Sequence, residues 1–203
     1  MKLSVPFYVQ GINECGPVNL QMILEYFGKK HDKEEIKKLV DSDNSGITWG
    51  LGLANTASHL GFSAEFYTTS VEVNASNYDL EYYQKQTDGL NAAKEKIKML
   101  LKKARKYGVK MEEKSLTLKE ILSKINEDCL AIILVDWSKL NNTSKFIGHF
   151  LTIVGYDDKN VYVHHPGPNN PKQCMPIEKE LFDLARKSKG TDEDTVFIHG
   201  KSS

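Results

Sequence analysis

Cys15 and His149 are the two residues whose types and surroundings could do chemistry together. Cys15 lies in the stretch Gln10-Gly-Ile-Asn-Glu-Cys-Gly-Pro17, where an extended segment is expected to meet a helix. A helix N-terminus offers free backbone N–H groups and a positive dipole end, which favour a thiolate and can stabilise an oxyanion. His149 follows Gly148 and opens an apolar strand. A thiol and an imidazole so placed suit a nucleophile and its general base.

The helix that carries Cys15 is indicated by its apolar spacing. Pro17 suits a first helical turn, Gly28 is a natural C-terminal stop, and a buried stripe lies between them at Leu20, Ile23, Leu24 and Phe27. Gln10, upstream of the cysteine, could supply a second oxyanion donor. An ion pair between a thiol and an imidazole is favoured because their pKa values lie close together.

A third group usually orients the imidazole of such a pair, and His165 is the candidate. It follows His149 by sixteen residues, on the neighbouring strand of a predicted hairpin. His164 should point to the other face, because neighbouring residues of a strand face opposite ways. For the same reason a metal site of His149 with both histidines is not expected. Of the remaining histidines, His31 is expected to be exposed to solvent, and His59 to pack on its helix or face water. His199 has no obvious partner.

Composition excludes several classes of protein. The 203 residues carry 27 basic and 27 acidic side chains, so no net charge attracts nucleic acid or acidic membranes. No apolar run approaches the length of a membrane helix, and the N-terminus has too short an apolar core for a secretory signal, so we expect a cytoplasmic protein. Cys15, Cys129 and Cys174 are widely spaced, which argues against a disulfide framework and a zinc site. We expect no cofactor.

Sequence patterns predict an α+β fold with N-terminal helices packed on a C-terminal antiparallel sheet. Helices are expected at 15–27, 33–40, 47–60, 90–107, 117–125 and 177–187, and strands at 62–68, 109–113, 129–135, 150–155, 160–164 and 195–199. Residues 41–46 suggest a loop, and 70–90 are hard to interpret. The basic residues between 94 and 110 form either a solvated helix face or a docking surface for an acidic partner.

Two blocks of the chain resemble the bacteriocin-processing, double-glycine leader peptidases, family thirty-nine of the cysteine peptidases in the papain-like clan. One block runs from Gln10 through Glu14-Cys-Gly-Pro17 to Tyr26-Phe-Gly28, followed by Ser45-Gly-Ile-Thr48 and Leu60-Gly-Phe62. The other is Gly148-His-Phe-Leu-Thr-Ile-Val-Gly155 with the hairpin up to Pro166-Gly167. Together they cover about half of the chain, residues 5–62 and 129–168.

The resemblance implies a papain-like fold and a cysteine peptidase that cleaves a peptide bond through a thioester. It implies Cys15 as nucleophile, His149 as base, His165 as third residue and Gln10 as oxyanion donor. The family has Asp or Asn where this chain has His165, so a weakly active or inactive peptide-binding module is the alternative, as is an acyltransferase with the same site. The chain is expected to be a single peptidase-like domain, residues 1–203, with a helical insertion at about 68–128.

Overall fold

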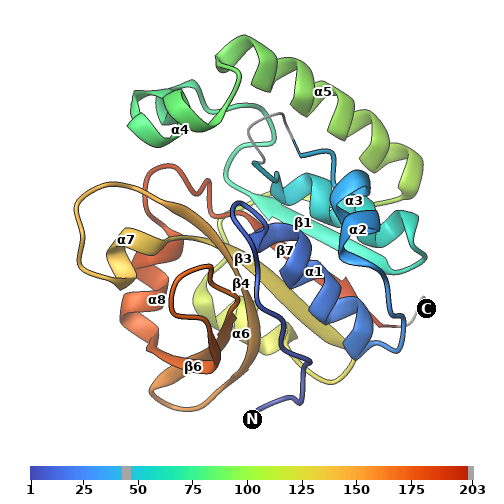
Figure 1. Ribbon diagram of the computed structural model, residues 1–203, viewed down its shortest axis with the longest axis vertical. Coiled ribbons are helices and arrows are strands. Elements are labelled where there is room, and N and C mark those ends of the chain that lie inside the picture. Colours follow the sequence, from blue (N-terminus) through green and yellow to red (C-terminus); the bar gives the residue numbers. More distant parts are fainter. Residues whose placement is uncertain (43–46, 201–203) are drawn as a thin grey trace.

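One mixed sheet organises the molecule in the computed structural model, which describes residues 1–42 and 47–200 (Figure 1). Its order is β2-β1-β7-β3-β4-β5-β6, and neighbours are antiparallel except for the parallel pair β1 and β2. The strands are β1 (Ser63–Thr68), β2 (Lys110–Glu113), β3 (Cys129–Asp136), β4 (Gly148–Tyr156), β5 (Asn160–His165), β6 (Lys172–Glu178) and β7 (Thr195–His199).

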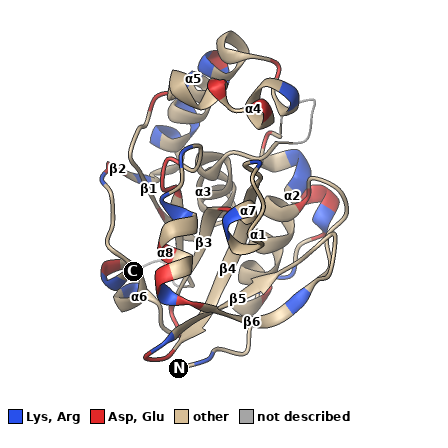
Figure 2. Cartoon of the chain, turned by 90° about the vertical axis from the view of Figure 1, so that its left-hand side faces the viewer, with Lys and Arg blue, Asp and Glu red and all other residues tan. Residues whose placement is uncertain are grey.

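Helices cover both faces of this sheet, as the strands β3 and β4 run between α1 and α8 (Figure 2). The helices are α1 (Cys15–Tyr26), α2 (Lys33–Leu39), α3 (Gly50–His59), α4 (Glu81–Gln86), α5 (Leu90–Tyr107), α6 (Leu118–Lys124), α7 (Trp137–Leu140) and α8 (Lys179–Arg186), with a 3-10 turn η1 (Ala75–Asp79). Helix α1 packs on β4, and α3 packs on β1 and β7.

Local signals explain most helix boundaries. Asp32 caps α2 by accepting from the Glu34 N–H, and Thr117 with Glu120 forms a complete capping box on α6. Gly108 ends α5 in the left-handed region, at φ +71°. The helices predicted at 33–40, 90–107 and 117–125 are confirmed, as is the α+β, papain-like fold class.

One edge of the sheet gathers the chain segments that build the candidate site. Strand β3 ends there, its antiparallel neighbours β4 and β7 begin there, and Val135 pairs with His149. Helix α1 begins beside Phe150 of β4, and α3 begins where Gly50 packs against Asp194, just before β7. Two helix N-termini therefore face the same edge.

Several expectations need correction. The sheet is not built from the C-terminal part alone, because β1 and β2 come from the first 113 residues and pair in parallel. Strand β6 and the short helix α7 were not predicted, and the helix expected at 47–60 begins at Gly50. Residues 70–90 form η1 and α4. Of the predicted loop at 41–46, residues 43–46 lie outside the described part.

The region expected as an insertion, 68–128, contributes α4, α5 and α6 and the edge strand β2. Helix α5 packs on α3, and Leu100 and Ala104 are fully buried. Its status as an insertion into a smaller domain stays a prediction. Across residues 1–42 and 47–200, no helix is both long and apolar enough to cross a membrane.

Candidate active site

A cavity of about 380 Å³ opens at the sheet edge where α1 begins, and Cys15, His149 and Gln10 all line it. Cys15 is the first residue of α1, and His149 is the second residue of β4. The structure thus brings together residues separated by more than 130 positions in the chain. His165, on the adjoining strand β5, reaches the same cluster by contacting His149.

A chain of hydrogen bonds fixes the proton positions on the two histidines. His165 Nε2 lies 3.0 Å from the carbonyl oxygen of Asn169, and His165 Nδ1 lies 3.0 Å from His149 Nε2. A carbonyl only accepts, so a neutral His165 carries its proton on Nε2 and accepts at Nδ1. His149 must then donate from Nε2, which leaves the lone pair of its Nδ1 for a proton from another group.

Trp137 packs over this histidine pair. Its ring stacks on His165 with centroids 4.0 Å apart and meets His149 edge-on at 5.1 Å. Helix α7, which carries Trp137, is capped by the Asp136 side chain, which accepts from the Ser138 N–H. The indole therefore shields the hydrogen bond between the imidazoles from water, and strengthens it by lowering the local dielectric.

Burial holds the cysteine and the histidine in their neutral forms. It lowers the pKa of His149 to about 3, with a further contribution from His165. Burial also raises the pKa of the Cys15 thiol, although the backbone N–H groups of Phe150 and Gly16 pull it down. Both shifts oppose the expected thiolate–imidazolium ion pair, because desolvation penalises the charged form of each group.

Gln10 is held in the cavity wall by its backbone and its amide. Its N–H donates to the Pro166 carbonyl at 2.9 Å, and Nε2 donates to the Gly11 carbonyl at 3.1 Å. The amide carries a second N–H on Nε2. Its Oε1 is buried without a hydrogen-bond partner. Gln10 and Cys15 therefore line the same cavity, and the role of Gln10 as an oxyanion donor stays a prediction.

Glu14 fastens the loop between Gln10 and Cys15, a role that the sequence reasoning missed. Its carboxylate accepts from the Gly11 N–H at 2.7 Å and pairs with Lys33 and Lys37 of α2, each at 2.8 Å. Burial alone would raise the pKa of Glu14, but the hydrogen bonds from the two lysines and Gly11 lower it to about 2. The loop that leads into Cys15 is thereby anchored to α2.

Asn19 joins α1, which carries Cys15, to β4, which carries His149, and the sequence patterns did not indicate it. Its Nδ2 donates to the carbonyls of Cys15 and Phe150, both at 2.8 Å, and its Oδ1 accepts from Thr152 at 2.6 Å. Asn19 is fully buried. The available signal was an amide one helical turn after Cys15, on a face otherwise apolar.

Gly16 permits the close approach of the segment before α3. A Cβ at this position would lie 2.6 Å from Cγ2 of Thr48. Thr48 and Trp49 line the cavity beside Cys15. The glycine that follows the cysteine is therefore required by packing, and any side chain there would displace the cavity wall.

The other histidines lie away from the cavity. His164, which faces opposite to His165 as predicted, bonds to the Val5 carbonyl at 3.0 Å and accepts from the Cys174 N–H at 3.1 Å. His59 packs on Tyr107, and His31 contacts Glu35. His199 does have partners, contrary to expectation: Glu65 at 2.8 Å and the Cys129 sulfur at 4.0 Å.

Metal chemistry has no candidate ligand set in the described chain. Over residues 1–42 and 47–200, His, Cys, Asp and Glu side chains form no group of three or more that could hold a metal ion. Cys129 is buried at the start of β3, as expected for a small apolar residue.

Three solved structures with a similar fold are described as peptidases or peptidase domains. The peptidase domain of Streptococcus ComA, a bifunctional ABC transporter, matches with a TM-score of 0.54 and 14% identity over 97% of this chain and 98% of that one. A putative C39-like peptidase from Bacillus anthracis matches at 0.60 and 14%, covering 100% of both. A double glycine motif protease from an AMS/PCAT transporter, solved with its leader peptide, matches at 0.56 and 16% over 98% and 94%. The fold is that of C39 peptidase domains.

The sequence comparisons match proteins described as guanylyl cyclases. Guanylyl cyclase 1 of Arabidopsis thaliana is 27% identical over 201 residues, which cover 92% of this chain and 72% of that protein. The family model described as guanylylate cyclase matches residues 5–198, nearly the whole chain and every residue of the candidate site. The chain thus belongs to the guanylylate cyclase family, and this member has the fold of a C39 peptidase domain.

Proposed function

We propose that the protein is a thiol-dependent peptidase in which Cys15 attacks a peptide carbonyl and His149 acts as the base. The observation that carries this proposal is the hydrogen-bonded chain from Asn169 through His165 to His149. It leaves Nδ1 of His149 as the unprotonated acceptor nitrogen, and His149 and Cys15 line the same cavity. A base in the correct tautomer beside a thiol at a helix start is what nucleophilic acyl chemistry requires.

The reaction proceeds from a neutral pair. His149 Nδ1 takes the thiol proton while the sulfur bonds to the carbonyl carbon, and the carbonyl oxygen becomes an oxyanion. The N–H groups at the start of α1 and the Gln10 amide stabilise this oxyanion. His149 then gives the proton to the leaving amine, the C–N bond breaks, and a thioester remains on Cys15. Water, deprotonated by His149, attacks the thioester, which releases the acid and restores the thiol.

His165 supports the imidazolium because its Nδ1 accepts a hydrogen bond from the Nε2–H of His149, although a neutral ring stabilises that charge less than a carboxylate would. The buried, stacked geometry with Trp137 compensates in part, because it fixes the imidazole in one orientation. An amine in place of water would convert the same thioester into a new amide. Acyl transfer therefore shares every step with hydrolysis until the thioester forms, and the two reactions differ only in the group that attacks it.

Guanylyl cyclisation is a second candidate, favoured by the family match and the name of the Arabidopsis relative. Binding of a nucleoside triphosphate calls for positive charge around its phosphates. The described residues that line the cavity include Glu72, Asp192 and Asp194 but no Lys or Arg. The charge of the cavity therefore favours the peptidase proposal over the cyclase.

The test is incubation of the full chain with a mixture of random-sequence peptides, with new termini read by mass spectrometry. The proposal predicts cleavage by the unmodified protein and by Cys129→Ala, and none by Cys15→Ala. In a parallel experiment the same proteins are incubated with GTP and Mg²⁺ or Mn²⁺, and the cyclic GMP formed is measured. Cyclic GMP formed equally by the unmodified protein and Cys15→Ala, without peptide cleavage, would overturn the proposal. Peptide binding without any cleavage would identify a binding module.

A further inference from the structure

The cavity has a second end that the proposed chemistry does not use. Asp192 and Asp194, which precede β7, line it together with Asn74, Asn77 and Tyr83. The Leu134 N–H donates to the Asp194 carbonyl, and Leu134 pairs with Phe150, the residue after His149. Asp194 is thus two strands along the same sheet edge from His149, on the order of 10 Å at the usual strand spacing.

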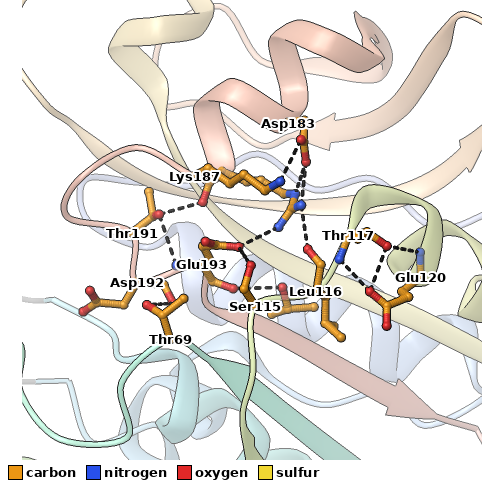
Figure 3. Close-up of polar contacts among 12 residues, drawn as sticks. Thr69, Ser115, Leu116, Thr117, Glu120, Asp183, Lys187, Thr191, Asp192 and Glu193 are labelled. Atoms are coloured by element: carbon orange, nitrogen blue, oxygen red, sulfur yellow. Dashed lines mark hydrogen bonds and ion pairs between the residues drawn. The ribbon is translucent and has the colours of Figure 1, made fainter.

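The loop that carries these acids is rigidly held. Arg186, which is 1% exposed, donates to the Leu116 carbonyl at 2.7 Å and pairs with Asp183 and Glu193. Figure 3 shows the Asp192 carboxylate pointing away from this ion-pair network, while its backbone carbonyl meets Thr69. The arginine therefore neutralises Glu193 but neither Asp192 nor Asp194.

The polar atoms at this end include acceptors that lack a cationic partner. Asp192 accepts from Asn74 Nδ2 at 3.1 Å and from Asn77 Nδ2 at 2.7 Å, which orients the Asn77 amide. The Oδ1 of Asn77 is buried without a hydrogen-bond partner, and the residue is 3% exposed. A buried acceptor without a donor costs free energy. A ligand that donates a hydrogen bond to this oxygen removes that cost and therefore binds more tightly.

Asp194 has no structural ion pair that would explain its position. Its carboxylate packs against the first residue of α3, where a Cβ on Gly50 would meet Oδ2 at 2.7 Å. Among the described residues no Lys, Arg or His side chain pairs with it or with Asp192, and no Lys or Arg lines the cavity. Burial and the neighbouring Asp192 raise the pKa of Asp194 to about 8. Such a carboxyl costs stability unless a cation pairs with it.

Aromatic faces complete this end of the cavity. Tyr78, Tyr82 and Tyr83 line it, and Tyr83 is fixed by its hydroxyl, which donates to the Gly190 carbonyl at 2.5 Å. Tyr83 also stacks on Phe146 at 5.9 Å. Tyrosine faces attract organic cations, and paired carboxylates attract them more strongly.

We propose that the end of the cavity formed by Asp192, Asp194, Asn77 and the tyrosines binds a positively charged group of the peptide substrate. This inference rests on the proposed function, because it assigns the substrate class of the same cavity. The charged group is an arginine or lysine side chain or a peptide amino terminus. About 10 Å separates the acids from His149, a span that two to three residues of extended peptide cover. The cation therefore belongs to a residue near the scissile bond.

The test uses full-length Cys15→Ala protein, so that binding is measured without turnover. The probes are two acetylated, amidated libraries of random hexapeptides, one with arginine and one with citrulline at a fixed central position. A second pair of libraries carries lysine or norleucine at the same position, and a further library has a free amino terminus. These probes distinguish a charged side chain from a charged amino terminus. We expect the arginine library to bind at least about tenfold more tightly than its uncharged isostere, as for a partly buried ion pair.

Asp194→Asn should remove this preference, whereas Asp158→Asn, at an exposed hairpin acid, should leave it intact. Asp194→Asn should also raise the melting temperature at pH 8, since it removes an unpaired acid. Equal binding of charged and uncharged libraries, or guanosine binding more tightly than the arginine library, would overturn the inference. The libraries need no Asp194 variant, so a folding defect cannot obscure the result. Charge-selective binding without cleavage by the unmodified protein would overturn the peptidase proposal and leave this inference standing.

Discussion

Two cysteine–histidine pairs lie at opposite ends of β3, and they differ in how the imidazole is held. Cys129 begins β3, and its sulfur lies 4.0 Å from His199 Nε2, which is also 2.8 Å from the Glu65 carboxylate. At the other end, Val135 pairs with His149, and His149 shares the cavity with Cys15. On residue types alone, Cys129, His199 and Glu65 resemble a catalytic triad more than Cys15, His149 and His165 do.

The difference lies in which imidazole nitrogen is occupied. His199 uses the same Nε2 for Glu65 that faces the Cys129 sulfur, so this nitrogen cannot serve the thiol as well. His149 is anchored through Nε2, which leaves Nδ1 for its partner. Burial raises the pKa of Cys129 to about 12, and no helix begins there. A cysteine near a histidine is therefore not sufficient: the third group must bind the far side of the ring.

The largest expected effect separates the two thiols. Cys15→Ala should reduce peptide cleavage by at least about a thousandfold, because the nucleophile is removed. Cys129→Ala removes a buried sulfur at the other end of β3 and should leave cleavage within about twofold, at a cost in stability of about 1 kcal/mol. Cleavage rates with a library-derived peptide and urea melts measure both. Equal losses in the two variants would contradict the distinction.

The next effect separates the two histidines. His149→Ala should lower kcat by about 10²–10⁴, as expected for loss of a general base. His199→Ala breaks the contact with Glu65 and should change stability more than kcat. If His199→Ala lost as much activity as His149→Ala in folded protein, the site would not be confined to the cavity.

A substitution at His165 sharpens the comparison, because it gives His149 the carboxylate that His199 already has. His165→Asp should raise the pKa of His149 from about 3, since a negative neighbour favours the imidazolium and the unfavourable contribution of His165 is removed. The base must be neutral to work, so the acidic limb of the kcat/KM profile should move to higher pH, by about 1–3 units. An unchanged profile would show that His165 does not contact the working base.

The smallest effect concerns the connection between α1 and β4. Asn19→Ala leaves the Cys15 and Phe150 carbonyls without their shared donor in the core, and should cost about 2–3 kcal/mol in the free energy of unfolding. Asn55→Ala is the control, since Asn55 donates to Leu100 on α5, away from the cysteine. Only Asn19→Ala should also reduce kcat in protein that urea melts show to be folded at the assay temperature.

Sequence patterns predicted the elements with complete local signals and missed those that depend on distant contacts. The capping box at Thr117 and the stripe from Leu20 to Phe27 are readable from neighbours alone. Strand β6 contains Pro176 and has polar residues at both ends, and it forms because β5 offers a partner. Short α7 depends on the Asp136 cap.

The candidate site divides in the same way. Cys15, His149 and His165 could be proposed because each lies at or next to the end of a recognisable element, and Gln10 because it lies five residues before Cys15. Asp194 could not, because its place depends on the insertion of β7 between β1 and β3, which periodicity does not encode. The pKa shifts of Cys15 and His149 were also not predictable, since they follow from burial in the folded chain.

Alkylation of the native protein tests the central claim without a known substrate. Iodoacetamide rates at Cys15, Cys129 and Cys174 can be read by peptide mapping at pH 7.5, in unmodified protein and in His149→Ala. Cys174 is a partly exposed thiol away from the cavity and serves as the reference. The account predicts that Cys15 reacts faster than Cys129, which stays nearly unmodified, and that His149→Ala slows Cys15 by about tenfold or more without changing Cys174. A Cys15 rate that is independent of His149, or equal to that of Cys129, would contradict it.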